Sequence, residues 1–253
     1  MQKKAETSWG SVASWYDEML HDEKSFQKSV IAPNLLRLLN IQKGDRILDL
    51  ACGTGYFSNI FFKEGAHVQG VDIGSELIDI ARESSPLQIE YSVASADKIP
   101  QIQSKTIDKV VIVLALQNIE NVSGVLSECK RVLKPGGTLS LVLNHPTFRI
   151  PQSSEWGWDD AKKIEYRRID KYLSESKIQI DMHPGEKKKQ KTISFHRSLQ
   201  YYFKQFAKHN FGVSRLEEWI SHRQGPKGKR FAASEQARKE IPLFLFLEIK
   251  NFM

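Results

Sequence analysis

Two short segments constrain the fold of this chain more than any other part of it. The first, ILDLACGTGYFS at residues 47–58, has the pattern of a buried strand, a glycine turn and the start of a helix. The second, VQGVDIG, has the pattern of another strand and ends near Asp72, seventeen residues after Gly55. Glycines let backbone approach a ligand closely, and a helix N-terminus offers unpaired N–H groups. A carboxylate at the next strand end can accept both ribose hydroxyls, so the pair predicts a nucleoside site.

The glycine turn differs from the one used by dinucleotide enzymes. Those enzymes carry G-x-G-x-x-G/A, whose last small residue packs the helix on the strand. Here Ser58 stands at that last position, and Asp49 lies four residues before Gly53. A carboxylate there disfavours a pyrophosphate and favours a cationic amino-acid group. The turn therefore indicates a nucleoside that carries a cation.

Composition is ordinary for a globular protein, with 253 residues, 40% hydrophobic and 26% charged. No apolar run approaches the ~20 residues of a membrane span, and the N-terminal residues lack the apolar core of a signal peptide. The two cysteines, Cys52 and Cys129, imply no disulfide framework, and no zinc-ligand spacing is present, so we expect no metal site. These features predict a cytoplasmic protein.

The net charge of +7 is unevenly distributed along the chain. Residues 1–144 carry 15 Lys and Arg against 17 Asp and Glu, a net of −2, whereas residues 145–253 carry 22 against 13, a net of +9. The excess lies in two segments, EKKKQK at 186–191 and HRQGPKGKR at 222–230. They are interpreted either as solvated loops or as contacts for nucleic acid or an acidic substrate.

Strand and helix patterns alternate through the first part of the chain. We expect strands at 46–50, 67–71, 89–93, 109–114 and 138–143, and helices at 56–63, 76–83 and 122–133. Amphipathic helices are expected at 7–22 and 26–39, the second kinked or restarted at Pro33, with a later helix near 197–209 and strands at 213–219 and 243–249. This order predicts an α/β fold, a doubly wound, mostly parallel, seven-stranded Rossmann-like sheet. It has an antiparallel last strand and an insertion after strand five.

Four segments of this chain resemble motifs of the class I S-adenosylmethionine (SAM) methyltransferases. LDLACGTG is similar to the first motif, and ASADKIP at 94–100 to the segment after strand three. LALQNI at 114–119 is similar to the fourth motif, and RVLKPGG at 131–137 to the helix stop before strand five. The resemblance covers about residues 7–145 and 197–250. It fits small-molecule enzymes of the ubiquinone and menaquinone type better than the nucleic-acid branches.

The resemblance implies SAM as cofactor, S-adenosylhomocysteine (SAH) as product, and transfer of a methyl group to a small organic acceptor by in-line displacement. It divides the chain into N-terminal helices over the cofactor site (1–40), a SAM-binding core (41–145), a substrate insertion or cap (146–196) and the end of the core sheet (197–253). In the adenine segment Ser95 takes the place of the family's Asp, and Asp97 follows two positions later. The cofactor-binding residues it implies are Tyr16, Asp49, Ala51, Gly53, Gly55, Asp72, Ile73, Ser95, Ala96, Leu114 and Asn118.

The acceptor side carries no motif that names a substrate. His145 follows strand five at the carboxyl edge of the sheet and is our candidate acid/base; the alternative is that it caps the strand end. Aromatic and basic residues of the insertion indicate a flat or anionic acceptor; alternatively, the tryptophans only attach the insertion to the core. The candidate substrate-binding residues are Trp156, Trp158, Tyr166, Arg168 and His183.

Three other functions are compatible with these patterns. The basic second half would suit an RNA or protein methyltransferase, and the glycine turn leaves an NAD(P)-dependent oxidoreductase as a further alternative. A nucleoside-binding protein without catalysis is the third. The sequence does not decide between a monomer and a homodimer.

Overall fold

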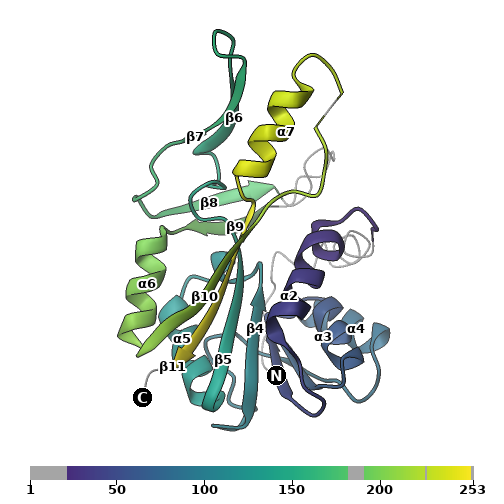
Figure 1. Cartoon of the computed structure of the whole chain (residues 1–253). Coiled ribbons are helices and arrows are strands. Elements are labelled where there is room, and N and C mark those ends of the chain that lie inside the picture. The colour runs from purple at the N-terminus through teal and green to yellow at the C-terminus, as the bar shows by residue number, and fades with distance from the viewer. Residues whose placement is uncertain (1–21, 182–190, 226, 252–253) are drawn as a thin grey trace.

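The computed structural model describes residues 22–181, 191–225 and 227–251. Its centre is a seven-stranded sheet in the order β10-β11-β5-β4-β1-β2-β3 (Figure 1). Only β11 runs antiparallel to its neighbours β5 and β10, while the other pairs are parallel. This confirms the predicted fold class. The strands are β1 (Arg46–Leu50), β2 (His67–Asp72), β3 (Glu90–Val93), β4 (Ile107–Val113), β5 (Leu133–Asn144), β10 (Phe211–Trp219) and β11 (Phe244–Asn251).

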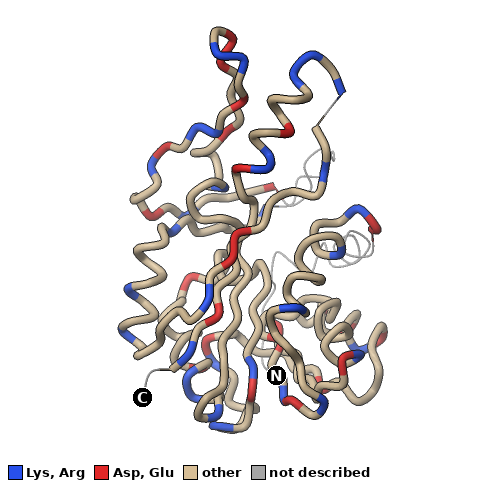
Figure 2. The backbone as a smooth tube through the Cα atoms, in the orientation of Figure 1, with Lys and Arg blue, Asp and Glu red and all other residues tan. Residues whose placement is uncertain are grey.

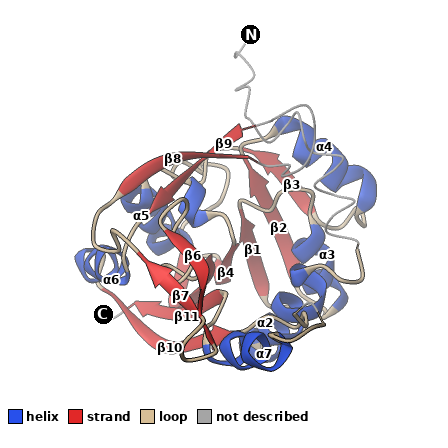
Figure 3. Cartoon of the chain, turned by 90° about the horizontal axis from the view of Figure 1, so that it is seen from above, coloured by secondary structure: helices blue, strands red, loops and turns tan. Residues whose placement is uncertain are grey.

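Helices cover both faces of this sheet (Figure 3). The predicted restart at Pro33 is present, because the π-helical turn η2 ends at Ile31 and α2 then begins with Pro33 in its first turn, where a missing N–H costs nothing. The helical elements are η2 (Gln27–Ile31), α2 (Ala32–Leu39), α3 (Tyr56–Lys63), α4 (Ser75–Ser84), η3 (Leu116–Asn118), α5 (Val122–Val132), α6 (Leu199–Lys208) and α7 (Phe231–Glu240).

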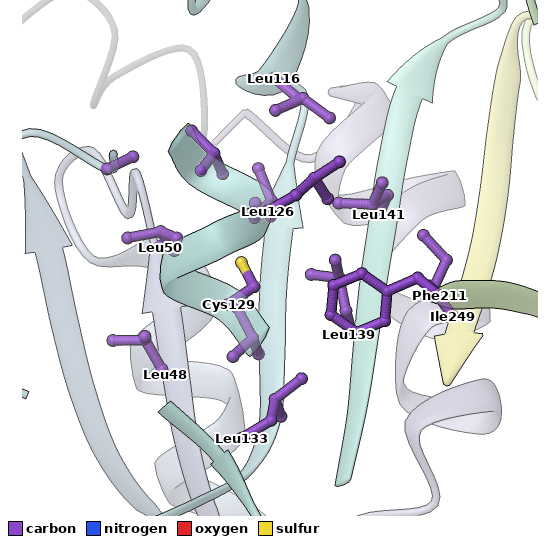
Figure 4. Close-up of a cluster of buried hydrophobic side chains, with 14 of the residues drawn as sticks. Leu48, Leu50, Leu116, Leu126, Cys129, Leu133, Leu139, Leu141, Phe211 and Ile249 are labelled. Atoms are coloured by element: carbon purple, nitrogen blue, oxygen red, sulfur yellow. The ribbon is translucent and has the colours of Figure 1, made fainter. Parts of the chain in front are cut away.

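The central strands are apolar on both faces and so contribute to two cores. On β11, Leu245 and Leu247 join the cluster under α5 and α6, whereas Phe244 and Phe246 join the cluster under α2 and α3. Figure 4 shows the first cluster, in which Cys129 of α5 lies among leucines of β1 and β5. Burial on both faces explains apolar stretches such as FLFL in β11.

The insertion after β5 consists of two hairpins. β6 (Ser154–Asp159) pairs with β7 (Ile164–Ile169), and β8 (Ser176–Asp181) pairs with β9 (Lys191–His196), each antiparallel. Both hairpins lie beyond the end of the sheet at which β5 ends (Figures 1 and 3). They therefore stand over the carboxyl edge, where open α/β sheets bind ligands.

Two features differ from the sequence prediction. The segment between β10 and β11 contains α7, which packs on β7, where we expected only a loop. β5 starts at Leu133, because Leu133 pairs with Ile107 and Thr138 with Lys109, so that the Lys-Pro-Gly-Gly turn bulges out of a longer strand. The predicted helix at 7–22 falls almost entirely outside the described residues, as does most of the lysine-rich 186–191 segment. No helix in the described ranges is long and apolar enough to cross a bilayer.

Candidate nucleoside site and acceptor site

A cavity of about 480 Å³ opens at the carboxyl ends of β1, β2, β3 and β4. Its size is within the range of small-ligand pockets, roughly 300–1,000 Å³. The residues come from four separate strand ends that the parallel sheet brings to one edge. Eight of the predicted cofactor residues line it: Ala51, Gly53, Asp72, Ile73, Ser95, Ala96, Leu114 and Asn118.

Asp72 joins the two segments from which the prediction began. Its Oδ2 accepts a hydrogen bond from the Gly53 N–H at 3.0 Å, and its Oδ1 accepts one from the Gly74 N–H at 2.8 Å. Burial raises the pKa of this carboxyl above its ordinary value, although the backbone donors oppose the rise. Each oxygen keeps a second lone pair, so the carboxylate can still accept hydroxyl groups from the cavity.

Asp49 lies behind the glycine turn, outside the lining of the cavity. It is 2% exposed, and its Oδ2 accepts a hydrogen bond from Ser58 Oγ at 2.6 Å. This bond explains why Ser58 stands where dinucleotide enzymes have Gly or Ala. Burial raises the pKa of Asp49 to about 7; the Ser58 bond opposes this rise and the Asp72 carboxylate adds to it.

Gly55 also lies outside the lining and has a structural reason to be glycine. It precedes α3 with φ of 79°, and an added Cβ would overlap the Tyr91 hydroxyl and approach Ala81 Cβ to 3.1 Å. Its role is to turn the chain into the helix. Tyr16, the remaining predicted cofactor-binding residue, is outside the described residues.

Two non-glycine residues of the lining have left-handed backbone. Ala51, after β1, has φ of 61°, and Leu114, after β4, has φ of 53°. The Leu114 backbone is held on both sides, since its N–H donates to Val142 O at 2.8 Å and its carbonyl accepts from Gln117 Nε2 at 2.6 Å. Such conformations cost about 1–3 kcal/mol each and concentrate at binding sites, which is consistent with backbone presented to a ligand.

Asp97 is a cavity residue that our prediction left out. The Ser95 hydroxyl donates to Asp97 Oδ1, and Asn121 Nδ2 donates to Asp97 Oδ2 at 2.7 Å. The Ser95 bond, more than any other contact, lowers the pKa of Asp97. Asp97 is therefore the ionised hydrogen-bond acceptor at this end of the cavity, and the Ser95 hydroxyl donates its hydrogen bond to Asp97 rather than to a ligand. The signal was present, because Asp97 is the only carboxylate of ASADKIP.

His145 is 1% exposed and does not line the cavity. Its Nδ1 accepts from the Thr147 N–H at 3.2 Å, so that Nε2 carries the proton and donates to Glu218 Oε1 at 2.7 Å. Burial lowers the pKa of the imidazole despite Glu218. This geometry matches the strand-capping alternative that the sequence left open.

The predicted substrate residues of the insertion separate into two groups. Trp156 lines a second cavity, with the Arg167 guanidinium 5.4 Å from its ring centroid. The others make contacts outside both cavities: Trp158 packs under Arg230, Tyr166 covers Gly157, and Arg168 forms ion pairs with Glu155 and Asp170. Trp158 thus attaches the hairpin to the segment before α7. His183 lies outside the described residues.

A doubly wound sheet with a glycine turn after β1 and a carboxylate ending β2 defines the Rossmann-like class of nucleoside-binding domains. Residues 48–141 match the family described as "Methyltransferase domain". Residues 48–141 are therefore similar to methyltransferase domains, and the chain has distant homology to ubiquinone and menaquinone biosynthesis methyltransferases.

Curated relatives match a part of this chain. It is 32% identical over 121 residues to a ubiquinone biosynthesis O-methyltransferase of Xylella fastidiosa (strain 9a5c), covering 45% of this chain and 49% of that protein. It is 33% identical over 113 residues to a demethylmenaquinone methyltransferase of Tropheryma whipplei (strain Twist), covering 44% and 46%. The chain thus spans about half the length of these curated relatives.

The fold extends beyond the matched domain in solved structures. A crystal structure of an S-adenosylmethionine dependent methyltransferase from Mesorhizobium loti superposes with a TM-score of 0.71 and 24% identity. The match covers 88% of this chain and 99% of that one, which supports the fold over nearly the whole chain.

Proposed function

We propose that this protein binds SAM in the first cavity and transfers its methyl group to a small organic acceptor. The observation that carries the proposal is Asp72, whose carboxylate lies in the cavity while it holds the backbone of Gly53 and Gly74. The match of residues 48–141 to a methyltransferase domain, and the resemblance of the surrounding motifs to those of SAM methyltransferases, support the same function.

The residues of the cavity fit the parts of SAM. Asp72 has free lone pairs for the two ribose hydroxyls. Asp97, fixed by Ser95 and Asn121, offers a charged acceptor for the adenine amine, with Ala96 beside it. The methionine end belongs near Gly53 and Ala51, where the buried Asp49 would stabilise a cation from behind the turn.

SAM supplies a methyl carbon on a positively charged sulfur, and the transfer breaks the S–CH₃ bond as a bond to the acceptor nucleophile forms. Because this donor is already activated, the work of the protein is to orient the two partners and exclude water. The hairpins β6–β7 and β8–β9 stand over the carboxyl edge, and we propose that this insertion covers the acceptor.

A SAM-dependent RNA or protein methyltransferase is the second candidate, because the excess charge lies in the second half of the chain. Figure 2 supports it only in part, since Asp and Glu lie among the Lys and Arg of the hairpins and α7. Polymer binding through phosphates would weaken steeply with added salt, so the affinity for a short RNA measured against salt concentration decides it.

The test is isothermal titration calorimetry with SAM, SAH and NADH. Wild-type protein should bind SAM and SAH and not NADH. Asp72→Asn removes a charged acceptor and should weaken SAH binding about tenfold or more, because hydrogen bonds to charged groups contribute ~1.5–3 kcal/mol. The matched control is Asp79→Asn, an exposed carboxylate on α4 outside the cavity.

Binding of NADH without SAH would overturn the proposal in favour of an oxidoreductase. An Asp72→Asn variant that keeps its SAH affinity within about twofold of the control would overturn the ribose assignment. Mass spectrometry of a metabolite extract incubated with isotopically labelled SAM would then identify the acceptor, and absence of any labelled product would leave a binding protein.

A further inference from the structure

The second cavity is lined by four arginines from four separate segments. It measures about 450 Å³, and its arginines are Arg149 after β5, Arg167 on β7, Arg223 after β10 and Arg238 on α7. Its apolar wall consists of Phe26, Phe148, Trp156, Ile241, Pro242 and Leu243. No Asp or Glu is found among the described residues of the lining.

None of these four arginines forms an ion pair within the described parts of the chain, although the Glu155 carboxylate raises the pKa of Arg167 through its charge. Their hydrogen bonds go to neutral groups. Arg149 Nη1 donates to Asn144 Oδ1 at 2.6 Å, and Arg167 donates to Phe148 O at 2.9 Å and to Ser154 Oγ at 2.8 Å.

Arg223 and Arg238 also make few hydrogen bonds within the described residues. Arg223 Nη2 donates to Lys24 O at 3.1 Å, and its guanidinium lies 4.6 Å from the Phe26 ring centroid. Arg238 Nε is buried without a hydrogen-bond partner among the described residues. A guanidinium has five N–H donors, so each of the four keeps donors for a ligand.

The contrast with the neighbouring Arg168 is informative. Arg168 lies next to Arg167 on β7, points away from the cavity and forms ion pairs with Glu155 and Asp170. Burial, with repulsion from Arg167, lowers the pKa of Arg149 to about 10, and burial also lowers the pKa of Arg167. The Glu155 charge opposes the effect of burial at Arg167 without forming an ion pair. Partly desolvated cations without ion-pair partners gain most from a bound anion.

The arginine cavity and the nucleoside cavity both border a third, smaller space. A smaller space of about 170 Å³ shares Phe26, Arg149 and Arg223 with the arginine cavity. It also shares Leu114, the strained residue after β4, with the nucleoside cavity. A molecule anchored at the arginines would therefore extend toward the carboxyl ends of β1 and β4.

We propose that the arginine cavity holds the acidic group of the methyl acceptor, and that the acceptor is a small organic anion with a carboxylate or phosphate on an apolar, preferably aromatic, body. This inference rests on the proposed methyltransferase function. Arginine pairs with both groups through two parallel N–H donors, and the aromatic wall packs against the apolar body. The methyl-accepting atom then lies on the side of the acceptor that faces Leu114.

The experiment titrates the whole protein, saturated with SAH, with three probes by ligand-observed NMR. The probes are benzoate, phenyl phosphate and the neutral isostere benzamide. The variants are Arg149→Gln/Arg167→Gln and Arg223→Gln, with Arg215→Gln as the control, an exposed arginine of β10 that lines neither cavity. Circular dichroism monitors folding, and Arg223→Gln, at an exposed position, keeps the test decisive if the double variant does not fold.

We expect at least one anion to bind, benzamide to bind at least tenfold more weakly, and the double variant to lose about tenfold or more of the anion affinity. Arg223→Gln should weaken anion binding several-fold, and the control Arg215→Gln should leave it unchanged. The stronger of the two anions identifies the acidic group. Equal binding of benzamide, or equal anion binding in all variants, would overturn the inference.

SAH binding separates the two proposals. If SAH binds and the anions do not, the acceptor class is wrong while the methyltransferase proposal stands. If arginine-dependent anion binding occurs in a protein that binds neither SAM nor SAH, the proposed function fails, and so does the assignment of the anion as a methyl acceptor.

Discussion

Replacing Asp49 with asparagine should raise the stability of the folded protein at neutral pH while it lowers the affinity for SAM. The native pKa of Asp49 is about 7, against an ordinary value of 3.8. Because the native state holds this proton more tightly, the wild-type protein is most stable where both states are protonated. It loses stability as pH rises between the two values, and the loss is complete above about pH 7.

The magnitude follows from the difference of about three pKa units. At ~1.36 kcal/mol per unit, ionising Asp49 in the native state costs about 4 kcal/mol of the free energy of unfolding, of which about 3 kcal/mol is lost between about pH 5 and pH 8. Asp49→Asn keeps an oxygen for the Ser58 hydroxyl and removes the titration. The variant should therefore gain stability relative to wild type as pH rises.

Urea unfolding of both proteins at the two pH values, without ligand, measures this gain. Asp72 titrates in both proteins and largely cancels in the difference. We expect the advantage of Asp49→Asn to be about 3 kcal/mol larger at about pH 8 than at about pH 5, while its SAM affinity falls, since the cation loses its counter-charge. A stability difference that is the same at both pH values would refute the raised pKa of Asp49.

Two further predictions concern the glycine turn and the strand cap. In thermal unfolding, Gly55→Ala should destabilise the protein more than Gly44→Ala does. Both glycines have positive φ, where an alanine costs ~1–2 kcal/mol, but only an alanine at position 55 would also collide with Tyr91. An equal loss in the two variants would show that the Tyr91 contact relaxes freely. His145→Gln should lower the free energy of unfolding by about 1–3 kcal/mol and leave SAH affinity unchanged, because it breaks the partly buried hydrogen bond to Glu218. Loss of turnover at full stability would instead support the acid/base role.

The sequence predicted the sheet well because inner strands that are buried on both faces carry apolar stretches, such as VVIV in β4 and FLFL in β11. Helix α7 was missed because only Ser234 and Ala237 of it are buried, which leaves no apolar stripe at helical spacing. In the β6–β7 hairpin, β6 is partly exposed along its length, and β7 alternates only between exposed and partly buried residues. Neither strand therefore has the fully buried face of a half-buried strand.

The nucleoside cavity was predictable and the arginine cavity was not. Parallel strands bring their carboxyl ends to one edge, so residues following β1, β2, β3 and β4 must meet there. Arg149, Arg167, Arg223 and Arg238 come from a loop, a hairpin, a second loop and a helix. In the sequence these four arginines are far apart and no pattern groups them. The packing of α7 on β7 brings the elements of Arg238 and Arg167 together.

The position of β11 has a consequence for how the protein is made. β11 lies between β5 and β10, although the chain reaches it only at residues 244–251. As the chain leaves the ribosome, β10 emerges without a partner in the sheet, and the open side of β5 has no neighbour until β11 follows. An unpaired apolar strand edge readily pairs with other chains, so the nascent protein passes through an aggregation-prone stage that ends only when β11 inserts. Interruption of synthesis before residue 244 should therefore yield a product that depends on chaperones, however well its nucleoside site is already encoded.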